Sequence, residues 1–347
     1  MPRALLAALA LTAVSSWPNF AQAPDDPRIR AAFLQMIERP RVPLAPQTAP
    51  RPDSAVYRAE QFSFASEAGE RVPGVFFKSA RGADRRPAVI FLHGTGSRKE
   101  EFLALMRTFA DRGFATAAID ARHHGARILP AFGPGNAQYF AAMLETYRTG
   151  KGRPYLYDTV WDVMRLVDYL QARADVDPAR IGVMGISKGG TEAYLAAAVD
   201  PRIAVAVPII GVQGFRWALD NDQWQPRVST FSPPIDRAAR DEGVAKIDAA
   251  FVRRFYDRVS PGIYGDYDAG SMLALIAPRP VLVINGDSDP RTPRAGVEEA
   301  VASAQRTYIK MDAEANLGLY LQPNAGHVVT PVAELVMADW FVKWLAP

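Results

Sequence analysis

The segment Gly185-Ile-Ser187-Lys-Gly189 has the residue types and spacing of a nucleophilic serine held on a tight turn. Residues 180–184 predict a buried strand before it, and the small residues from 190 to 199 predict a helix after it. A serine at such a turn presents its hydroxyl for attack on a carbonyl carbon, and the flanking glycines permit close approach of backbone segments. The alternative interpretation is a serine in an ordinary turn.

A serine hydroxyl is a weak nucleophile, so it needs a base and a carboxylate that orients the base. On strand–turn–helix folds of this kind the chain order is serine, then acid, then histidine. The four histidines are His93, His123, His124 and His327, and only His327 follows Ser187. We therefore predict that His327 is the base. The alternative is a loop histidine without a catalytic role.

Two aspartates follow the strand predicted at 280–285, in the segment Gly286-Asp287-Ser288-Asp289-Pro290. Asp289 lies three residues after the turn glycine and has room to bend toward the histidine. Asp287 is placed to cap the turn through nearby backbone amides. We favour Asp289 as the triad acid, with Asp287 as the alternative.

The negative charge on the attacked carbonyl oxygen requires two hydrogen-bond donors. The backbone N–H of Lys188 and that of Thr95, in the segment His93-Gly-Thr95-Gly-Ser97, are the predicted pair. We expect His93 to hold this loop in shape by hydrogen bonding rather than to act as a base. The side chain of Lys188 is expected to be solvated or paired with an acid.

Adjacent histidines at 123 and 124 raise the possibility of a metal site, but no carboxylate or third imidazole is spaced to complete one. Support of the active-site floor is the favoured interpretation. The chain has no cysteine, which excludes disulfides, thiolate catalysis and Fe–S clusters. We predict no metal and no organic cofactor.

The element pattern alternates between apolar strands and helices and predicts an α/β fold with a mostly parallel sheet covered by helices on both faces. Strands are expected at 57–64 and 72–77 (an antiparallel hairpin), 88–92, 115–119, 180–184, 203–209, 280–285 and 317–322. Helices are expected at 26–38, 100–112, 158–172, 190–199, 293–310 and 331–345. Two insertions, 122–157 and 211–277, follow carboxyl ends of strands, where open α/β sheets keep their sites.

Both insertions are rich in aromatic residues, and some of these are expected to line an apolar substrate pocket. Trp217, Trp224 and Tyr157 are the candidates. The alternative is that the aromatic side chains pack the insertions against the body of the protein.

The segments before and after Ser187 resemble the α/β-hydrolase superfamily. The resemblance rests on residues 175–190, on the HGTGS segment at 93–97, on GDSDP at 286–290 and on the Gly-His pair ending at His327. It is strongest to the dienelactone hydrolase, acetyl-xylan esterase and prolyl-oligopeptidase-like branch and covers roughly residues 55–347. The cysteine nucleophile of dienelactone hydrolases is impossible here, and the chain before the first strand is too short for a propeller.

The resulting functional hypothesis is a serine hydrolase that cleaves carboxylic esters, small or polymer-borne, through an acyl-enzyme. The alternatives are a peptidase or amidase with the same triad, and a non-catalytic binding protein of the same fold.

The predicted organisation is a signal peptide (1–23), a Pro-rich segment (24–56) and a catalytic domain (57–347). An apolar run and the Ala21-Gln-Ala23 motif indicate export to the periplasm or the medium; a buried N-terminal helix is the alternative. Prolines between 40 and 52 predict an extended strap that joins no ladder. The net charge of +3, spread along the chain, disfavours nucleic-acid binding, and no apolar run is long enough to span a membrane.

Overall fold

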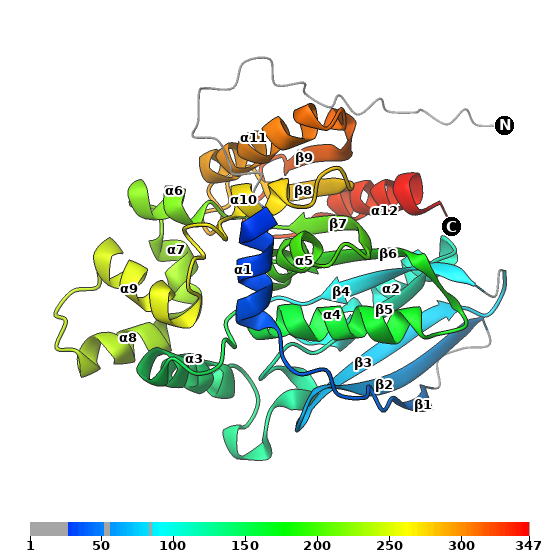
Figure 1. The fold of residues 1–347 in the computed structure, drawn as a ribbon, viewed down its shortest axis with the longest axis horizontal. Helices are drawn as coiled ribbons and strands as arrows, with labels where there is room; N and C mark the ends of the chain where they lie inside the picture. The colour runs from blue at the N-terminus through cyan, green and yellow to red at the C-terminus, as the bar shows by residue number, and fades with distance from the viewer. Residues whose placement is uncertain (1–26, 52–55, 83–84, 347) are drawn as a thin grey trace.

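The computed structural model describes residues 27–51, 56–82 and 85–346, and the predicted signal peptide lies outside them. Within these ranges the strands form one sheet in the order β1-β2-β3-β5-β4-β6-β7-β8-β9 (Figure 1). The strands are β1 (Gln47–Arg51), β2 (Tyr57–Glu67), β3 (Glu70–Ser79), β4 (Arg86–Leu92), β5 (Ala115–Ile119), β6 (Val176–Ile186), β7 (Ile203–Ile209), β8 (Val281–Gly286) and β9 (Leu317–Gln322). Three neighbouring pairs are antiparallel: β1 with β2, β2 with β3, and β3 with β5. The remaining neighbours, from β5 through β4, β6, β7 and β8 to β9, are parallel.

Helices connect these strands and cover both faces of the sheet (Figure 1). They are α1 (Pro27–Ile37), α2 (Leu103–Asp111), α3 (Ala137–Thr149), α4 (Tyr157–Gln171), α5 (Lys188–Val199), α6 (Phe215–Asp220), α7 (Gln225–Val228), α8 (Ser232–Asp241), α9 (Ala249–Val259), α10 (Ala269–Ala274), α11 (Arg294–Lys310) and α12 (Pro331–Leu345).

The alternation of side chains along β4 explains the layers. Ile90 and Leu92 point to one face and pack in a core shared with α1, α4, α5 and α11. Val89 and Phe91 point to the other face and pack in a core shared with α2 and α12. A strand buried on both faces reads as a continuous apolar run, and the predicted mostly parallel sheet with helices on both faces is present.

The expectation that the Pro-rich strap joins no ladder was wrong. β1 pairs antiparallel with β2, with Thr48 opposite Phe62 and Pro50 opposite Glu60. β1 is an edge strand of the sheet, where proline is tolerated because an N–H that faces outward has no neighbouring strand to bond to.

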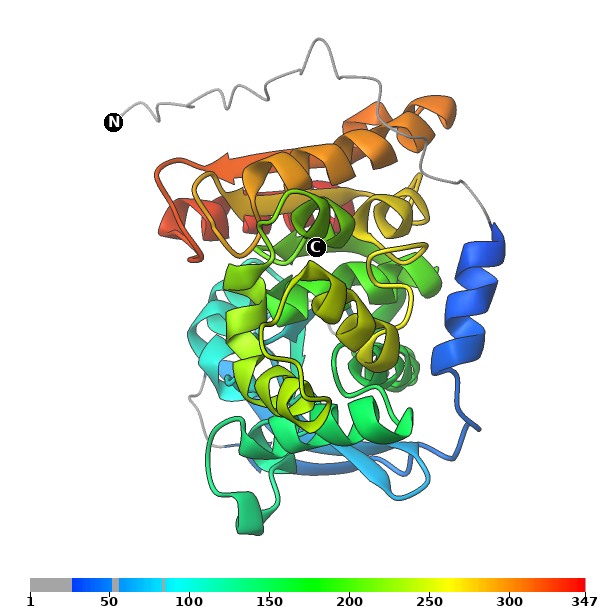
Figure 2. The same cartoon turned by 90° about the vertical axis from the view of Figure 1, so that its left-hand side faces the viewer.

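Both insertions lie on one side of the molecule, which faces the viewer in Figure 2. The first carries α3, the second carries α6 to α10, and α3 packs against α8 and α9. Tyr147 of α3 stacks on Phe255 of α9 with ring centroids 5.1 Å apart. The aromatic residues of the two insertions therefore pack largely against each other.

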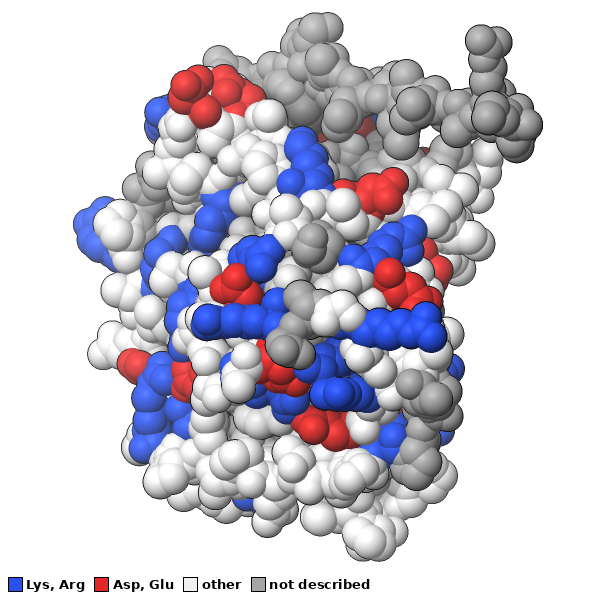
Figure 3. Space-filling view, turned by 90° about the vertical axis from the view of Figure 1, so that its right-hand side faces the viewer, with Lys and Arg blue, Asp and Glu red and all other residues white. Residues whose placement is uncertain are grey.

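The opposite side of the molecule carries a mixed charge pattern. Figure 3 shows Lys and Arg side chains lying among Asp and Glu side chains across its central band. Across residues 27–51, 56–82 and 85–346, no helix combines the length and the apolar character needed to cross a bilayer.

Candidate active site

Ser187 occupies the turn between β6 and α5 with a strained backbone. Its φ is +56° and its ψ is −115°, a conformation that non-glycine residues rarely adopt. The Ser187 N–H donates to the carbonyl of Ile209 at 2.8 Å, which ties the turn to the end of β7.

The glycines around Ser187 allow the turn to exist because backbone segments touch there. A Cβ at Gly185 would lie 2.0 Å from the carbonyl oxygen of Gly189, and one at Gly189 would lie 2.1 Å from that of Leu92. A Cβ at Gly211 would lie 2.4 Å from the carbonyl oxygen of Ser187. The sharp turn predicted from the glycine spacing is present.

The structure brings the predicted nucleophile, base and acid together at the carboxyl ends of β6, β9 and β8. His327 Nε2 lies 2.8 Å from Ser187 Oγ, and His327 Nδ1 lies 2.7 Å from Asp289 Oδ2. Because a carboxylate only accepts, Nδ1 carries the proton and Nε2 is left to accept from the serine hydroxyl. This arrangement can deprotonate Ser187 during attack on a carbonyl.

Asp289 is buried and held by several donors. Its Oδ1 accepts from the Arg291 N–H at 2.9 Å, and Thr292 Oγ1 lies 2.7 Å from Oδ2. Burial opposes ionisation, but the hydrogen bonds from His327 and Thr292 outweigh it and keep the pKa of Asp289 below its ordinary value. Thr292 was not predicted, because nothing in the sequence marks it.

Asp287 faces solvent and holds the turn that leads to His327. Its carboxylate accepts from the N–H groups of Asn324 at 2.9 Å and Ala325 at 3.2 Å. These bonds, the one from Asn324 first, lower the pKa of Asp287. The placement agrees with the capping role considered for this residue.

The two predicted oxyanion donors lie on segments that meet at the turn around Ser187, called the elbow below. Lys188 is the first residue of α5, where a backbone N–H has no partner within the helix. Thr95 lies in a turn after β4 that is closed by Ser97 N–H donating to the Gly94 carbonyl at 3.2 Å. The Thr95 N–H takes no part in the hydrogen bond that closes this turn.

His93 fastens this turn to the loop after β5, as expected from the sequence. Its Nδ1 lies 2.8 Å from the Gly94 carbonyl oxygen, and its Nε2 accepts from the Ala121 N–H at 3.0 Å. Burial, assisted by the charge of Lys188, lowers the pKa of His93 to about 4. The neutral ring is therefore a structural link.

Sequence reasoning missed a second link between the same two loops. Asp120 is fully buried and accepts from Lys99 Nζ at 2.7 Å and from the Ala126 N–H at 2.8 Å. A Cβ at Gly125 would lie 2.3 Å from the Asp120 carboxyl group. Neither the residue types nor the spacing of this segment predicted the contact.

The Lys188 side chain is buried and forms an ion pair with Glu192, one helical turn along α5. Burial raises the pKa of Glu192, against the effect of Lys188. The ammonium group thus points into the protein below the elbow, and only the Lys188 backbone is placed to serve the site.

His123 and His124 bond to neighbouring protein atoms. His123 Nδ1 lies 2.9 Å from Gln138 Nε2, and His124 Nδ1 lies 2.7 Å from the Arg122 carbonyl oxygen. Among residues 27–51, 56–82 and 85–346, no group of three or more potential ligands is arranged around a metal position.

The three residues predicted to line the substrate pocket lie in different environments. Tyr157 is fully buried, its ring is 4.9 Å from that of Phe33, and its hydroxyl donates to the Pro261 carbonyl at 3.1 Å. This corrects the expectation for Tyr157, because α1 covers it. Trp224 is 8% exposed and donates to Asp222 at 3.0 Å, and Trp217 packs over Gly296 of α11. Substrate contact by the two tryptophans stays a prediction.

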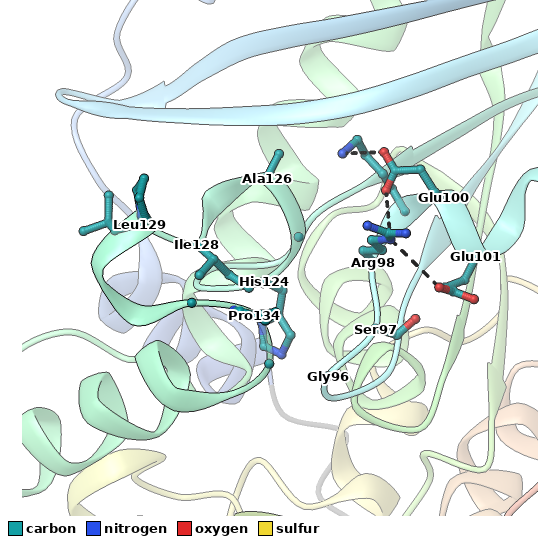
Figure 4. Close-up of a pocket in the computed structure, with 15 residues that line it drawn as sticks. Gly96, Ser97, Arg98, Glu100, Glu101, His124, Ala126, Ile128, Leu129 and Pro134 are labelled. Carbon is teal, nitrogen blue, oxygen red and sulfur yellow. Dashed lines mark ion pairs between the residues drawn. The ribbon is translucent and has the colours of Figure 1, made fainter.

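A cavity of about 620 Å³ opens beside the Thr95 loop. Figure 4 shows it between the segment Gly96–Glu101 and the segment His124–Gly135. Arg98 and Lys99 form ion pairs with Glu100 there, at 3.8 Å and 2.9 Å. Such a volume is typical of a small-molecule pocket.

Two family models match the chain. The model described as acetyl xylan esterase (AXE1) matches residues 36–217, and the model described as glucuronyl esterase, fungi, matches residues 135–311. Each match spans half of the chain or more.

Curated relatives align over most of the chain. Putative hydrolase YtaP from Bacillus subtilis (strain 168) is 28% identical over 289 residues, which are 80% of this chain and 84% of that protein. The 2,6-dihydropseudooxynicotine hydrolase of Paenarthrobacter nicotinovorans is 25% identical over 269 residues, which are 77% of this chain and 60% of that protein.

Among solved structures, acetyl xylan esterase 1 from Thermoanaerobacterium sp. JW/SL YS485 superposes with a TM-score of 0.66 at 16% identity, over 93% of this chain and 95% of that one. This likeness concerns the fold. Taken with the family matches, it shows that the chain belongs to the carboxylic ester hydrolases of α/β-hydrolase fold described by the acetyl xylan esterase (AXE1) and fungal glucuronyl esterase families.

Proposed function

We propose that this protein hydrolyses carboxylic esters through an acyl-enzyme on Ser187. The observation that carries the proposal is the unbroken line of contacts from Ser187 Oγ to His327 at 2.8 Å and from His327 to Asp289 at 2.7 Å. The strained backbone at Ser187 supports it, because such strain is typical of nucleophile turns.

In the proposed mechanism Ser187 Oγ attacks the ester carbonyl while His327 Nε2 takes the hydroxyl proton. The backbone amides of Lys188 and Thr95 donate to the oxyanion. His327 then gives the proton to the leaving alcohol, which departs and leaves an ester on Ser187. Asp289 holds the tautomer and stabilises the imidazolium. Water repeats the sequence and releases the acid.

The cavity beside the Thr95 loop would hold one half of the ester. Gly96 and Ser97 form part of its wall and directly follow the proposed oxyanion donor. The names of the matched families make acetylated xylan and glucuronyl esters the first compounds to assay.

An experiment that compares an aryl acetate with the matching acetanilide tests the reaction class. We expect hydrolysis of the ester, little hydrolysis of the anilide, and loss of turnover in Ser187→Ala while the fold is kept. Ester turnover by the variant within tenfold of the wild-type rate would refute the serine mechanism. A preference for the anilide would indicate an amidase.

We also propose that the protein is exported. The support is the apolar run and the Ala21-Gln-Ala23 motif near the N-terminus. N-terminal sequencing of protein recovered outside the cytoplasm should give a start between Ser16 and Pro24. Full-length protein kept in the cytoplasm would contradict export.

A further inference from the structure

The side chain of Asn136 does not bond to the helix that it precedes. Asn136 directly precedes α3, a position where an asparagine side chain commonly accepts a hydrogen bond from the first turn of the helix. Here it forms no such bond, and its backbone, with φ −101° and ψ 4°, is not extended. The residues in the same position before α9, α10 and α12 are extended and accept bonds from their own helices; they are Asp248, Asp268 and Thr330. The Asn136 amide is therefore not used to begin α3.

The amide of Asn136 lies instead against Gly96, in the turn after β4. A Cβ at Gly96 would lie 3.1 Å from Asn136 Nδ2 and 3.3 Å from Asn136 Oδ1, so the amide occupies the space that a side chain at position 96 would need. Oδ1 is enclosed and has no hydrogen-bond partner among the described residues. An enclosed amide oxygen without a partner is costly, so the placement of this side chain calls for an explanation.

Gly96 belongs to the turn that carries the proposed oxyanion donor. Ser97 N–H donates to the Gly94 carbonyl, so Thr95 and Gly96 are the two central residues of a β-turn. The φ of Gly96 is +77°, the value of the third residue of a type II turn, which favours glycine. The closing bond is 3.2 Å long, at the upper end of the range for N–H···O bonds. A turn closed by one long bond depends on contacts from outside it.

Thr95 lies between two such contacts. On one side His93 Nδ1 lies 2.8 Å from the Gly94 carbonyl oxygen, and on the other the Asn136 amide packs on Gly96. Gly94 itself lies beside the nucleophile, since a Cβ at Gly94 would be 3.6 Å from Ser187 Cβ. A shift of the turn at Gly96 would therefore move the Thr95 amide relative to Ser187.

We propose that Asn136 is a positioning residue that holds the Thr95 amide in place for the oxyanion. This inference rests on the proposed serine mechanism and adds to it a residue of the first insertion, on the segment that lines the cavity opposite Gly96 (Figure 4). An oxyanion donor stabilises charge that develops only in the transition state, so a displaced donor raises the barrier and leaves binding of the ester unchanged.

Steady-state kinetics and thermal melting of two variants at helix starts test the proposal. In Asn136→Ala we expect kcat for an aryl acetate to fall about tenfold, less than the loss of about a hundredfold that follows removal of a donor, with KM unchanged. The Tm should stay close to that of the wild type, because the side chain caps no helix. Asp248→Ala is the matched control. It removes the bond from the Phe251 N–H at 2.8 Å, so its Tm should fall while kcat is kept.

A transition-state analogue separates positioning from a general loss of structure. The nucleophilic serine adds to a trifluoromethyl ketone and forms a tetrahedral oxyanion that needs the same donors as the reaction. The Ki of the ketone should rise in Asn136→Ala by about the factor by which kcat falls, and it should not change in Asp248→Ala. Should Asn136→Ala fail to fold, Asn136→Ser replaces it, because serine is favourable at a helix start and lacks the amide that contacts Gly96.

An active enzyme whose kcat and ketone Ki are unchanged in the Asn136 variant would overturn the proposal and leave the proposed function intact. A fall in kcat with an unchanged ketone Ki would also overturn it, because Asn136 would then act on the structure alone. Wild-type protein without ester hydrolysis that depends on Ser187 would instead refute the proposed function, and the role of Asn136 with it.

Discussion

The two aspartates after β8 make different contacts in the structure although they are two residues apart. Asp289 is buried against His327, and Asp287 is a partly exposed acceptor for the turn at 324–325. Sequence reasoning favoured Asp289 because of its distance from Gly286. In the structure Asp289 is the aspartate that contacts His327, and its role as the triad acid stays a prediction.

Asp289→Asn should lower kcat by at least about a hundredfold, because an amide cannot hold the required histidine tautomer or stabilise its charge. Asp287→Asn should keep most of the rate and lower the stability of the turn. Steady-state kinetics and thermal melting of the two variants measure both effects. The reverse pattern would make Asp287 the triad acid.

Some residues could be predicted from the sequence and others could not. His327 follows from chain order, since no other histidine lies after Ser187. Asp120 acts through its contact with Lys99, which lies 21 residues before it, and Thr292 bonds to Asp289 three residues before it, but no residue type or spacing marks either of them. Tyr157 was misassigned because the sequence pattern does not distinguish an aromatic residue that faces a pocket from one that faces the core.

At the scale of elements, the elbow depends on backbone contacts between β4, β6 and α5. Periodicity predicted these strands and helices, because each buries a continuous or one-sided apolar pattern. It failed for β1, since a proline count excludes a central strand but not an edge strand.

Gly189→Ala should disrupt the elbow, because its Cβ would lie 2.1 Å from the Leu92 carbonyl oxygen. We expect more than a tenfold loss of kcat/KM together with a lower Tm. Gly326→Ala, beside His327, is the matched control: a Cβ there meets no atom within 4 Å, so its stability should stay within about 0.5 kcal/mol of wild type. Equal behaviour of the two variants in kinetics and melting would contradict this account of the elbow.

For the whole molecule, buried neutral histidines make stability depend on pH. Burial lowers the pKa of His124 to about 2, with the charge of Lys188 acting in the same direction, and burial likewise lowers that of His93 to about 4. Below pH 6.5 the two histidines bind protons in the unfolded chain but stay neutral in the folded protein. Each histidine therefore removes stability as the pH falls from 6.5 toward its folded pKa, by about 1.4 kcal/mol per pH unit.

His124→Asn should lose less stability than the wild type between pH 7 and pH 5, because asparagine does not titrate and can still donate to the Arg122 carbonyl. Asp268, whose pKa burial raises to about 6, acts in the opposite direction in both proteins, so the difference isolates His124. Urea unfolding at several pH values measures it. Parallel curves for the two proteins would mean that His124 titrates normally in the folded state.

The most direct test of the central claim is covalent labelling of the folded enzyme with a fluorophosphonate, read out by intact-protein and peptide mass spectrometry. The account predicts one adduct per chain, located on Ser187, with ester hydrolysis lost in proportion to labelling and no adduct in Ser187→Ala. An enzyme that hydrolyses esters at full rate while Ser187 stays unlabelled, or after Ser187 has been labelled, would contradict it.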